Sequence, residues 1–398
     1  MPLPLEGYRI LDLSLWQQGS YATAMLADMG ADVIKIESIS NPDPGRGVGF
    51  GGPINNYFHS LNRGKRSIVL DLKSKAGLEV FWRLVEQADV FHNNLRGGAL
   101  GRLGITYERL QSVNPSIIMS SATGWGHLGP ERYMGAMDTL AQARGGFMSV
   151  TGDGPEAPPT PAGFPQADHV GAVTSGYSIV LALLHRERSG EAQEVNTSLY
   201  GSQLGIQSFG ITGAAWTGEV RGQLAHNQRP PTWNHFQAGD GKWFMIGALP
   251  PDKWWTEFCE VMDAPELAMD PYRTAADRTK RNAEVIAQMD SIFQTKPRDE
   301  WMRVFKERDM LVQPVANYLE ILDDEQAWAN DYLVKVPDPS GELRTMVGSP
   351  VHLSKTPARI DRMAPELGQH LEEVLLETGY EWEEIEALRA EGAFGSVE

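Results

Sequence analysis

Cysteine is nearly absent from the 398-residue chain, which contains only Cys259. No disulfide can form within the chain, and the disulfide-stapled architecture of small secreted proteins is excluded. The single thiol lies in the apolar run WWTEFCEVM, which is typical of a packed cysteine rather than a nucleophile. The first residues, MPLPLEGYRI, lack the basic and apolar segments of a signal peptide, so we expect a cytoplasmic protein.

Long apolar runs and positive charge are also scarce. The longest apolar run, SIVLALL from Ser178 to Leu184, is much shorter than the roughly 20 residues that a membrane span needs. We therefore expect no membrane partner. The chain has 35 Lys and Arg against 52 Asp and Glu, a formal charge of −17. Because such a surface repels nucleic acid, we expect no nucleic-acid partner, and a polyanionic ligand needs a local basic pocket.

Common catalytic and cofactor motifs are missing as well. The chain has no G-x-S-x-G nucleophile elbow and no H-x-x-x-H pair, so we predict neither the simplest hydrolase nor a metal site. GVGFGG, residues 47–52, matches the G-x-G-x-x-G fingerprint in letters. It follows NPDPGR rather than a strand and leads into PINNYFH rather than an expected helix. We therefore predict no NAD site.

The pattern that is present is typical of an α/β protein. Runs rich in β-branched residues occur at 8–14, 31–37, 67–72, 88–94 and 116–123. Helical spacing of apolar residues separates several of them, at 21–29 and at 75–86, where Ser74 is placed to cap the helix. Strands separated by helices pair in parallel, so we predict a doubly wound, Rossmann-like sheet.

The later part of the chain predicts a second, smaller α+β domain. Helical patterns at 251–262, 276–293 and 298–308 alternate with short strands near 232–248 and 335–351. We predict a large Rossmann-like domain over 1–200, a linker helix over 201–225, and a small α+β domain over 226–335. Residues 336–398 form a return segment that completes the large domain, with acidic amphipathic helices at 371–378 and 382–390.

Two basic segments stand out in the acidic chain. NRGKRSIVLDL, residues 62–72, runs into one strand, and NNLRGGALGRLG, residues 93–104, follows another. Either could be a solvated loop. If both lie at the carboxyl ends of strands, where a doubly wound sheet binds its ligands, they form a seat for a phosphorylated cofactor.

Asp168 lies in GFPQADHVGA, where a proline-rich loop meets the apolar helical pattern of 170–188. One interpretation is a helix N-cap, for which Asp is among the preferred residues. The other is a catalytic carboxylate, because a fixed carboxylate can act as a covalent nucleophile. We expect it to be ionised near neutral pH, since a free Asp has a pKa of about 3.9. The two interpretations are compatible.

A chain of segments resembles the class III CoA-transferase family, also called the CaiB/BaiF family, which includes formyl-CoA transferases. The segments, in order, are LEGYRILDLS, LADMGADVIKIE, LNRGKRSIVLDLKS, ADVFHNNLRGGALGRLG, NPSIIMSSATGWGHLGP, ADHVGA, SPVHLSKTP, APELGQHLEEVL and GYEWEEIEAL. The resemblance implies Rossmann-like halves with a smaller domain and an interlocked homodimer. A hetero-oligomer with a related chain stays open.

The resemblance also implies an activity and its residues. The activity is intermolecular transfer of coenzyme A from an acyl-CoA donor to a free carboxylic acid, through an aspartyl anhydride and an aspartyl-CoA thioester on Asp168. Gln17 and Asp138 match further active-site positions. The positions matched to CoA contacts are Leu72, Asn94 and Arg102, with Lys65, Arg66 and Arg96 as neighbours.

Departures from the family pattern limit the chemistry. Met137 precedes Asp138 where many members have Tyr or His, and because a thioether cannot accept a proton, racemisation is disfavoured. No run of glycines was found near 229–241, which argues against formyl-CoA chemistry. Intramolecular CoA migration and a non-catalytic subunit remain alternatives. Bulky residues expected near the acyl group favour a larger acid, such as an arylsuccinate with succinyl-CoA as donor: Trp16, Trp125, Tyr133 and Met137.

Overall fold

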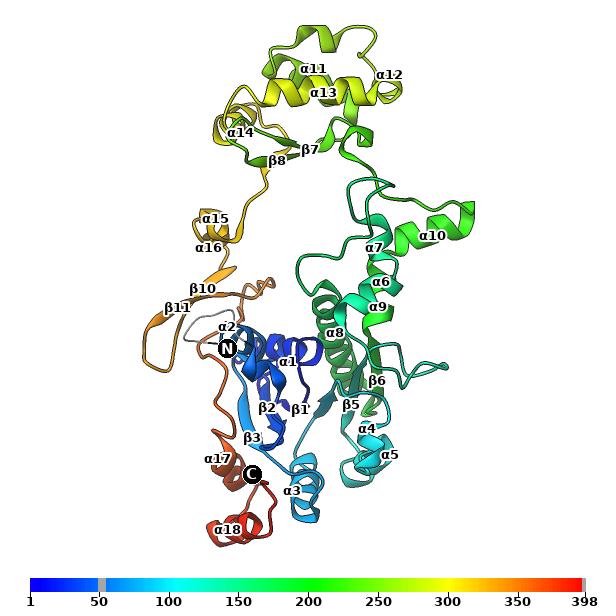
Figure 1. Ribbon diagram of the computed structural model, residues 1–398. Helices are drawn as coiled ribbons and strands as arrows, with labels where there is room; N and C mark the ends of the chain where they lie inside the picture. The colour runs from blue at the N-terminus through cyan, green and yellow to red at the C-terminus, as the bar shows by residue number, and fades with distance from the viewer. Residues whose placement is uncertain (49–54, 396–398) are drawn as a thin grey trace. The chain divides into compact units, whose positions relative to one another are not determined.

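The computed structural model describes residues 1–48 and 55–395, and the chain divides into two compact units (Figure 1). The first unit comprises residues 1–147, 161–212 and 326–398, and the second comprises 148–160 and 213–325. The second unit covers most of the predicted small domain, 226–335, and also takes in 148–160, which sequence analysis assigned to the large domain. Residues 49–52 of GVGFGG lie outside the described residues.

The first unit is built on a six-stranded parallel sheet. The sequence predicted its parallel, doubly wound form and five of its strands, but not the strand Glu194–Ser198. The strand order is β3-β2-β1-β4-β5-β6, and every neighbouring pair is parallel. The strands are β1 (Arg9–Leu13), β2 (Asp32–Glu37), β3 (Arg66–Val69), β4 (Val90–Asn93), β5 (Ile118–Thr123) and β6 (Glu194–Ser198). The order reverses between β1 and β4, and sheets of this kind bind ligands at the carboxyl ends of the strands at such a switch point.

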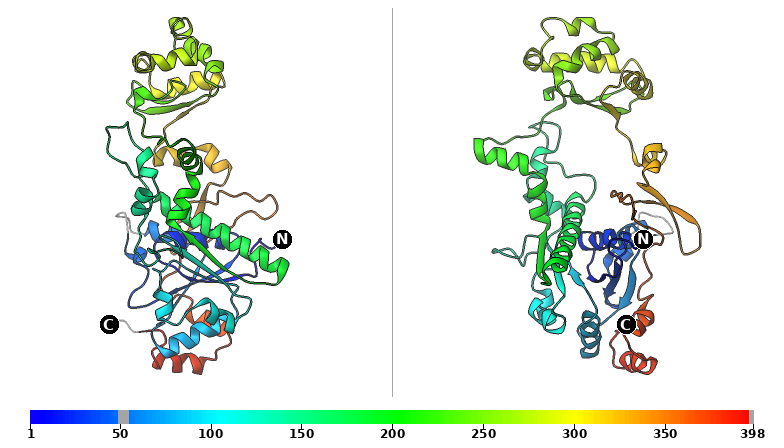
Figure 2. Two further views of the ribbon diagram at one scale, coloured as in Figure 1. Left: turned by 90° about the vertical axis from the view of Figure 1, so that its right-hand side faces the viewer. Right: turned by 180° about the vertical axis from the view of Figure 1, so that it is seen from behind.

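Helices cover both faces of this sheet, as Figures 1 and 2 show. On one face, Ile10 and Val33 pack with Ile179 of α8. On the other face, Leu11 and Phe91 belong to a core that includes residues of α3, α5, α17 and α18. The helices named are α1 (Gln18–Asp28) and α8 (Gln166–Ser189), and α3 (Lys75–Val85), α5 (Tyr107–Val113), α17 (Leu371–Glu377) and α18 (Trp382–Ala390). The C-terminal segment therefore completes the core of the first unit.

Helix α8 is, among the described residues, the one helix long and apolar enough to cross a membrane by length and composition. It is also longer than the predicted 170–188. Its buried residues include Ala172, Ile179 and Leu183, and two of them share a core with the sheet. Such packing against a sheet is typical of a helix in the core of a globular unit.

A row of buried polar side chains crosses the sheet. The strand register aligns Ser67, Lys35, Asp12, His92 and Ser120 on five neighbouring strands. All five side chains are fully buried. Burying charged groups is costly unless they are paired. Asp12 is paired with Lys65, which precedes β3, and also accepts a hydrogen bond from Thr23 of α1. Lys35 of this row also donates to the carbonyl of Ser14 in the loop that follows β1.

The second unit has a three-stranded antiparallel sheet, β7 (Trp233–Gln237), β8 (Trp243–Gly247) and β9 (Val312–Pro314). Three helices pack on it around an aromatic core that includes Phe236, Phe244 and Phe293: α11 (Pro251–Val261), α13 (Asn282–Phe293) and α14 (Arg298–Glu307). Cys259 is buried in this core, and burial raises the pKa of its thiol to about 12. The predicted packing role of the cysteine therefore fits its surroundings.

The remaining elements connect these layers. The hairpin β10 (Leu333–Pro337) and β11 (Leu343–Val347) belongs to the first unit. The other α-helices are α2 (Asn56–Asn62), α4 (Ala99–Arg102), α6 (Asp138–Arg144), α7 (Phe147–Val150), α9 (Leu199–Ile206), α10 (Ser208–Thr217), α12 (Ala275–Lys280), α15 (Tyr318–Leu322) and α16 (Glu325–Ala329). Short 3-10 helices lie at Pro44–Gly47, His226–Gln228 and Pro265–Ala268.

Candidate active site

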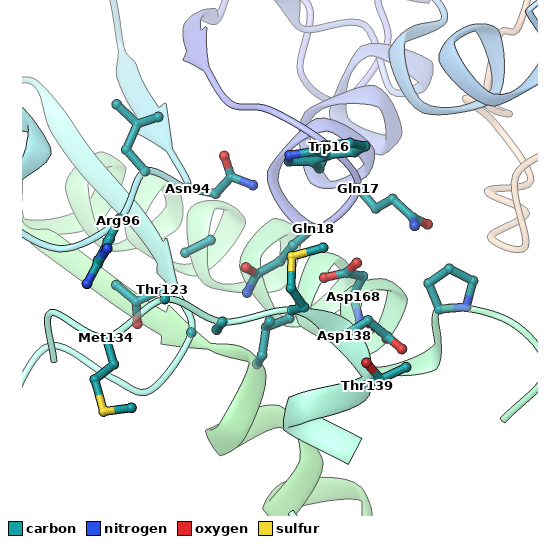
Figure 3. Close-up of a pocket in the computed structure, with 18 of the residues that line it drawn as sticks. Trp16, Gln17, Gln18, Asn94, Arg96, Thr123, Met134, Asp138, Thr139 and Asp168 are labelled. Atoms are coloured by element: carbon teal, nitrogen blue, oxygen red, sulfur yellow. Dashed lines mark hydrogen bonds between the residues drawn. The ribbon is translucent and has the colours of Figure 1, made fainter. Parts of the chain in front are cut away.

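A cavity of about 570 Å³ opens at the switch point of the sheet (Figure 3). Its wall comes from the loops that follow β1, β4 and β5, from residues 132–139, and from the first turn of α8 with the loop before it. Five of the predicted site residues line this one cavity although they are far apart in sequence: Gln17, Asn94, Arg96, Asp138 and Asp168. All of its lining residues belong to the first unit.

Asp168 lies in the first turn of α8 and is not its N-cap. The helix begins at Gln166 with Pro165 in the cap position, and no side chain caps it. The predicted cap role is therefore wrong: the helix begins before Asp168, whose backbone is already helical. Its own backbone N–H, which the helix leaves without a partner, donates to Oδ1 of Asp138 at 3.0 Å.

The surroundings of Asp168 raise its proton affinity. Burial is the main cause and the nearby charge of Asp138 is the second, and together they raise the pKa of Asp168 to about 7. The expectation that it titrates like a free Asp is therefore wrong. The carboxylate is more basic than an ordinary one and keeps a large ionised fraction at neutral pH, as a carboxylate nucleophile requires.

Asp138 is held between two segments by Gln142. The Nε2 group of Gln142 donates to Oδ2 of Asp138 at 2.5 Å, and its Oε1 accepts the N–H of Ala162 at 2.8 Å. The other oxygen of Asp138 accepts the Asp168 N–H. This chain of bonds fixes the first turn of α8 against α6 and the loop before α8, so Asp138 positions the nucleophile through its backbone.

Asn94 holds the loop between β1 and α1. Its Oδ1 accepts the N–H of Leu15 at 2.8 Å, and its Nδ2 donates to the carbonyl of Leu15 at 2.7 Å. The residue before Leu15 is fixed in the same way, because Ser14 donates its N–H to Asp12 and accepts a bond from Lys35. Asn94 lines the cavity, and its amide already bonds with the backbone of Leu15; its predicted contact with CoA stays a prediction.

Trp16 has a left-handed backbone with φ +59, a conformation that costs free energy for a residue with a side chain. Its N–H donates to Oδ1 of Asp43 at 3.0 Å. Asp43 in turn forms an ion pair with Lys35 at 2.9 Å, and both side chains are fully buried. Burial lowers the pKa of Lys35, but Asp43 and Asp12 outweigh it and leave the pKa raised. The buried pair thus holds the strained turn that presents Trp16 and Gln17 to the cavity.

Tyr57 is a cavity residue that sequence reasoning missed. It lies in α2, which begins after the N-cap Asn55, whose side chain accepts the N–H of Phe58 at 2.9 Å. The expectation that no helix follows GVGFGG is therefore wrong. The segment that precedes GVGFGG forms a 3-10 turn and not a strand. Burial, Asp43 and Asp168 all raise the pKa of the Tyr57 hydroxyl, which also bonds with Gln17. The Asn-Asn start of PINNYFH was the capping signal that could have found this helix.

Lys65 and Arg66 lie away from the cavity. Lys65 is fully buried, and its Nζ donates to Asp12, to the carbonyl of Ser20 and to Asn62. Arg66 pairs with three carboxylates, Asp32, Glu373 and Glu377. Both cations precede or begin β3, so they lie at its amino end rather than at the ligand edge. The structure gives both cations carboxylate partners, and their predicted contacts with CoA stay predictions.

Leu72 and Arg102 also lie outside the lining of the cavity. Leu72 is buried in a core cluster with residues of α3, and its predicted contact with CoA stays a prediction. Arg102 ends α4 and is exposed. Its guanidinium is close to Gly98, which lines a second cavity of about 380 Å³. Its predicted role toward phosphates stays a prediction.

The two cavities share a pair of cations. Arg96 and Arg132 line both. The Nε of Arg96 donates to the carbonyl of Tyr133 at 2.6 Å, and Arg132 stacks on the Tyr133 ring. Neither guanidinium forms an ion pair within residues 1–48 and 55–395. Both guanidiniums can therefore meet an anionic ligand at this edge.

The predicted bulky residues divide between the cavities. Trp16 and Met137 line the cavity of Asp168, where Phe164 and Met134 add further apolar surface. Trp125 lines neither cavity, and Tyr133 lines the second. Within the part of the chain that the structure describes, no group of three or more His, Cys, Asp or Glu could hold a metal ion.

A family model described as CoA-transferase family III matches residues 5–371 of this chain. The chain belongs to CoA-transferase family III. A curated relative, (R)-2-hydroxy-4-methylpentanoate CoA-transferase of Clostridioides difficile, is 31% identical over 96% of this chain and 97% of its own length. Succinyl-CoA:mesaconate CoA-transferase of Haloarcula hispanica is 34% identical over 94% of this chain and 96% of its own length.

A solved structure agrees with the family assignment. The crystal structure of a CaiB/BaiF family protein from Brucella suis superposes with a TM-score of 0.85, at 28% identity, over 95% of this chain and 100% of that chain. The predicted family and fold class are thereby confirmed. This member of CoA-transferase family III is an enzyme that transfers coenzyme A, which requires an acyl-CoA donor and an acid acceptor.

Proposed function

We propose that the enzyme transfers coenzyme A between succinyl-CoA and a free carboxylic acid through covalent intermediates on Asp168. The observation that carries the proposal is the setting of this carboxylate. It projects into a cavity with largely apolar walls, its pKa is raised to about 7, and its backbone is fixed by Asp138. A basic, immobile carboxylate out of bulk water is suited to attack a thioester.

The proposed reaction begins when a carboxylate oxygen of Asp168 attacks the thioester carbon of the donor. The carbon–sulfur bond breaks, the CoA thiolate leaves, and a mixed anhydride forms. The thiolate then attacks the Asp168 carbonyl carbon of the anhydride, which releases the donor acid and leaves an aspartyl-CoA thioester. No net proton is taken up or released in this half of the cycle.

The second half repeats the chemistry with the acceptor. A carboxylate oxygen of the acceptor attacks the aspartyl thioester carbon, the thiolate leaves, and a second anhydride forms. The thiolate attacks the acceptor carbonyl, the product acyl-CoA forms, and the Asp168 carboxylate is regenerated. Covalent catalysis thus divides one difficult exchange between two carboxylates into activated steps.

Three features support the proposed substrates. Two relatives are named for succinyl-CoA transfer to mesaconate and to D-citramalate, and one for exchange between succinate and glutarate. The guanidiniums of Arg96 and Arg132, which form no ion pair in the part of the chain that the structure describes, provide partners for an anionic ligand at the cavity. Trp16 and Phe164 add aromatic wall, so we propose an acceptor with a large or aryl body, of the arylsuccinate type, in preference to oxalate or formate.

Oxygen labelling tests the covalent route. In the proposed cycle, one oxygen of the acceptor carboxylate remains on Asp168 when the product leaves. Turnover with acceptor labelled with ¹⁸O in its carboxylate should therefore add label to the peptide that contains Asp168. Direct attack of the acceptor on the donor would send the label to succinate and leave the peptide unlabelled, and that result would overturn the proposal.

A further inference from the structure

The side chain of Gln18 is an unexplained buried donor at this cavity. Gln18 is 5% exposed, and it lines the same cavity as Asp168. Its Nε2 is buried and has no hydrogen-bond partner in the described part of the chain. A buried amide without a partner costs about 1–3 kcal/mol, so this group needs an explanation.

Gly171 shows where the Gln18 carboxamide lies. A Cβ atom built on Gly171 would lie 2.9 Å from Gln18 Nε2. Gly171 follows Asp168 by three residues in α8, so both positions are on one helix face, about 4.5 Å apart along the axis. The carboxamide therefore rests on the face of α8 that carries the nucleophile, in the space that the missing side chain of Gly171 leaves. Figure 3 shows Gln18 and Asp168 projecting into the same cavity.

The backbone around Gln18 also favours negative charge at this side of the cavity. Gln18 is the first residue of the eleven-residue α1, whose N-terminus faces the cavity through Trp16, Gln17 and Gln18. The first N–H groups of a helix have no intrahelical partners, and the helix dipole favours negative charge there. The loop before this turn is held by Asn94 and Asp43, so the donors are fixed before any ligand arrives.

We propose that Gln18 is a catalytic residue whose Nε2 donates a hydrogen bond to the thioester carbonyl oxygen as that oxygen becomes an oxyanion. This inference rests on the proposed attack by Asp168. Each tetrahedral intermediate needs a donor aimed at the developing charge, and a donor that has no protein partner pays no cost of breaking an existing bond. Gln17 differs, because it already has Tyr57 as a partner.

A Gln18→Met variant removes the donor and keeps the length of the side chain. We expect kcat to fall about 100-fold or more, the loss seen when one oxyanion donor is removed. We expect the KM for succinyl-CoA to change little, because the bond forms mainly in the transition state. Gln193→Met, at an exposed glutamine, is the matched control and should keep kcat. A Gln18→Met enzyme that is folded and turns over normally would overturn the inference.

Two glycines of α8 offer a test that leaves Gln18 in place. Gly171→Ala puts a methyl group where the carboxamide lies, whereas a Cβ on Gly176 meets its nearest neighbours at 3.6 Å and 3.7 Å, an ordinary contact. Both changes raise helix propensity by roughly 1 kcal/mol. We expect Gly171→Ala to be folded and slowed at least tenfold, and Gly176→Ala to be folded and active. Equal activity of the two variants would contradict the proposal.

The carbonyl stretch of bound succinyl-CoA, labelled with ¹³C at the thioester carbon, separates this inference from the proposed function. In Asp168→Asn the thioester cannot react, so its vibration can be measured at rest. We expect a shift to lower frequency on binding, and we expect Gln18→Met added to Asp168→Asn to abolish most of it. A shift that is unchanged by Gln18→Met would overturn the role of Gln18 alone, whereas absence of ¹⁸O on Asp168 would overturn only the covalent route.

Discussion

Asp168 shows how a short sequence context fails to determine the behaviour of one residue. The letters QADHVGA predict an acid at the start of a helix, and a helix N-terminus by itself favours the ionised form. Burial and the neighbouring Asp138 dominate instead and raise the pKa to about 7. Both causes come from segments that fold against α8 from elsewhere in the chain, so no local pattern contains them.

The pH dependence of acylation follows from this environment. Because Asp168 must be ionised to attack, the rate of CoA release in a single turnover should rise with pH to a midpoint near 7 and be level above it. At pH 5, two units below this midpoint, the ionised fraction of Asp168 and the rate of CoA release should be about 100-fold lower than in the level region at high pH. Stopped-flow detection of the free thiol between pH 5 and 9 measures this profile.

Asp138→Asn should move the midpoint to lower pH, because it removes the second cause of the raised pKa. Glu156→Gln, at an exposed carboxylate, should leave it unchanged. A wild-type midpoint near pH 4 would mean that Asp168 titrates as a free side chain, contrary to this account.

At the scale of elements, the loop from β1 to α1 is shaped by side chains from several parts of the chain. Asn94 and Lys35 bond with its carbonyls, and Asp12, Asn94 and Asp43 accept its N–H groups. The ion pair of Lys35 and Asp43 is entirely buried. Removing one member of such a pair leaves the other charge without compensation.

Asp43→Asn should therefore lower the free energy of unfolding by about 3 kcal/mol, measured by urea denaturation near pH 7. It should also lower kcat, because the strained turn at Trp16 loses the acceptor that holds it. Glu79→Gln, which breaks the exposed pair of Glu79 and Lys75, is the control and should change stability by less than about 1 kcal/mol. Equal effects of the two variants would show that Asp43 does not act as a buried clamp.

The elements themselves were largely predictable, and the reasons are local. Five strands of the parallel sheet and the three main helical segments of the second unit lie within a few residues of their predicted positions, whereas β6 was not predicted. Ser74 caps α3 by accepting the N–H of Gly77. The basic segment at 62–66 precedes or begins β3, so it lies at the amino end of that strand, whereas the cavity lies at the carboxyl ends of the strands. Gln18 had no signal in the sequence, because its significance depends on the empty space above Gly171.

At the scale of the whole molecule, α8 carries apolar side chains that the rest of the chain leaves exposed. One face of the helix exposes large apolar side chains at helical spacing: Val173, Tyr177, Val180, Leu181 and Leu184. A second copy of the chain is the partner that the family resemblance implies, and contiguous apolar surface is typical of stable subunit contacts.

We therefore expect a homodimer of twice the 43.9 kDa chain mass in sedimentation velocity of the chain purified alone. Tyr177→Glu, which places a charge in the middle of this face, should shift the population toward monomer. Glu187→Gln, near the end of the same helix, should not. A monomeric wild-type chain with full activity would contradict the expected assembly, and activity only after addition of a related chain would indicate a hetero-oligomer.

The most direct measurement is mass spectrometry of the enzyme mixed with succinyl-CoA and digested under conditions that preserve thioesters. We predict a CoA adduct on the peptide that contains Asp168, removed by adding acceptor acid and absent from Asp168→Asn. An adduct on another residue, or normal turnover by Asp168→Asn, would contradict the central claim that this carboxyl group carries coenzyme A.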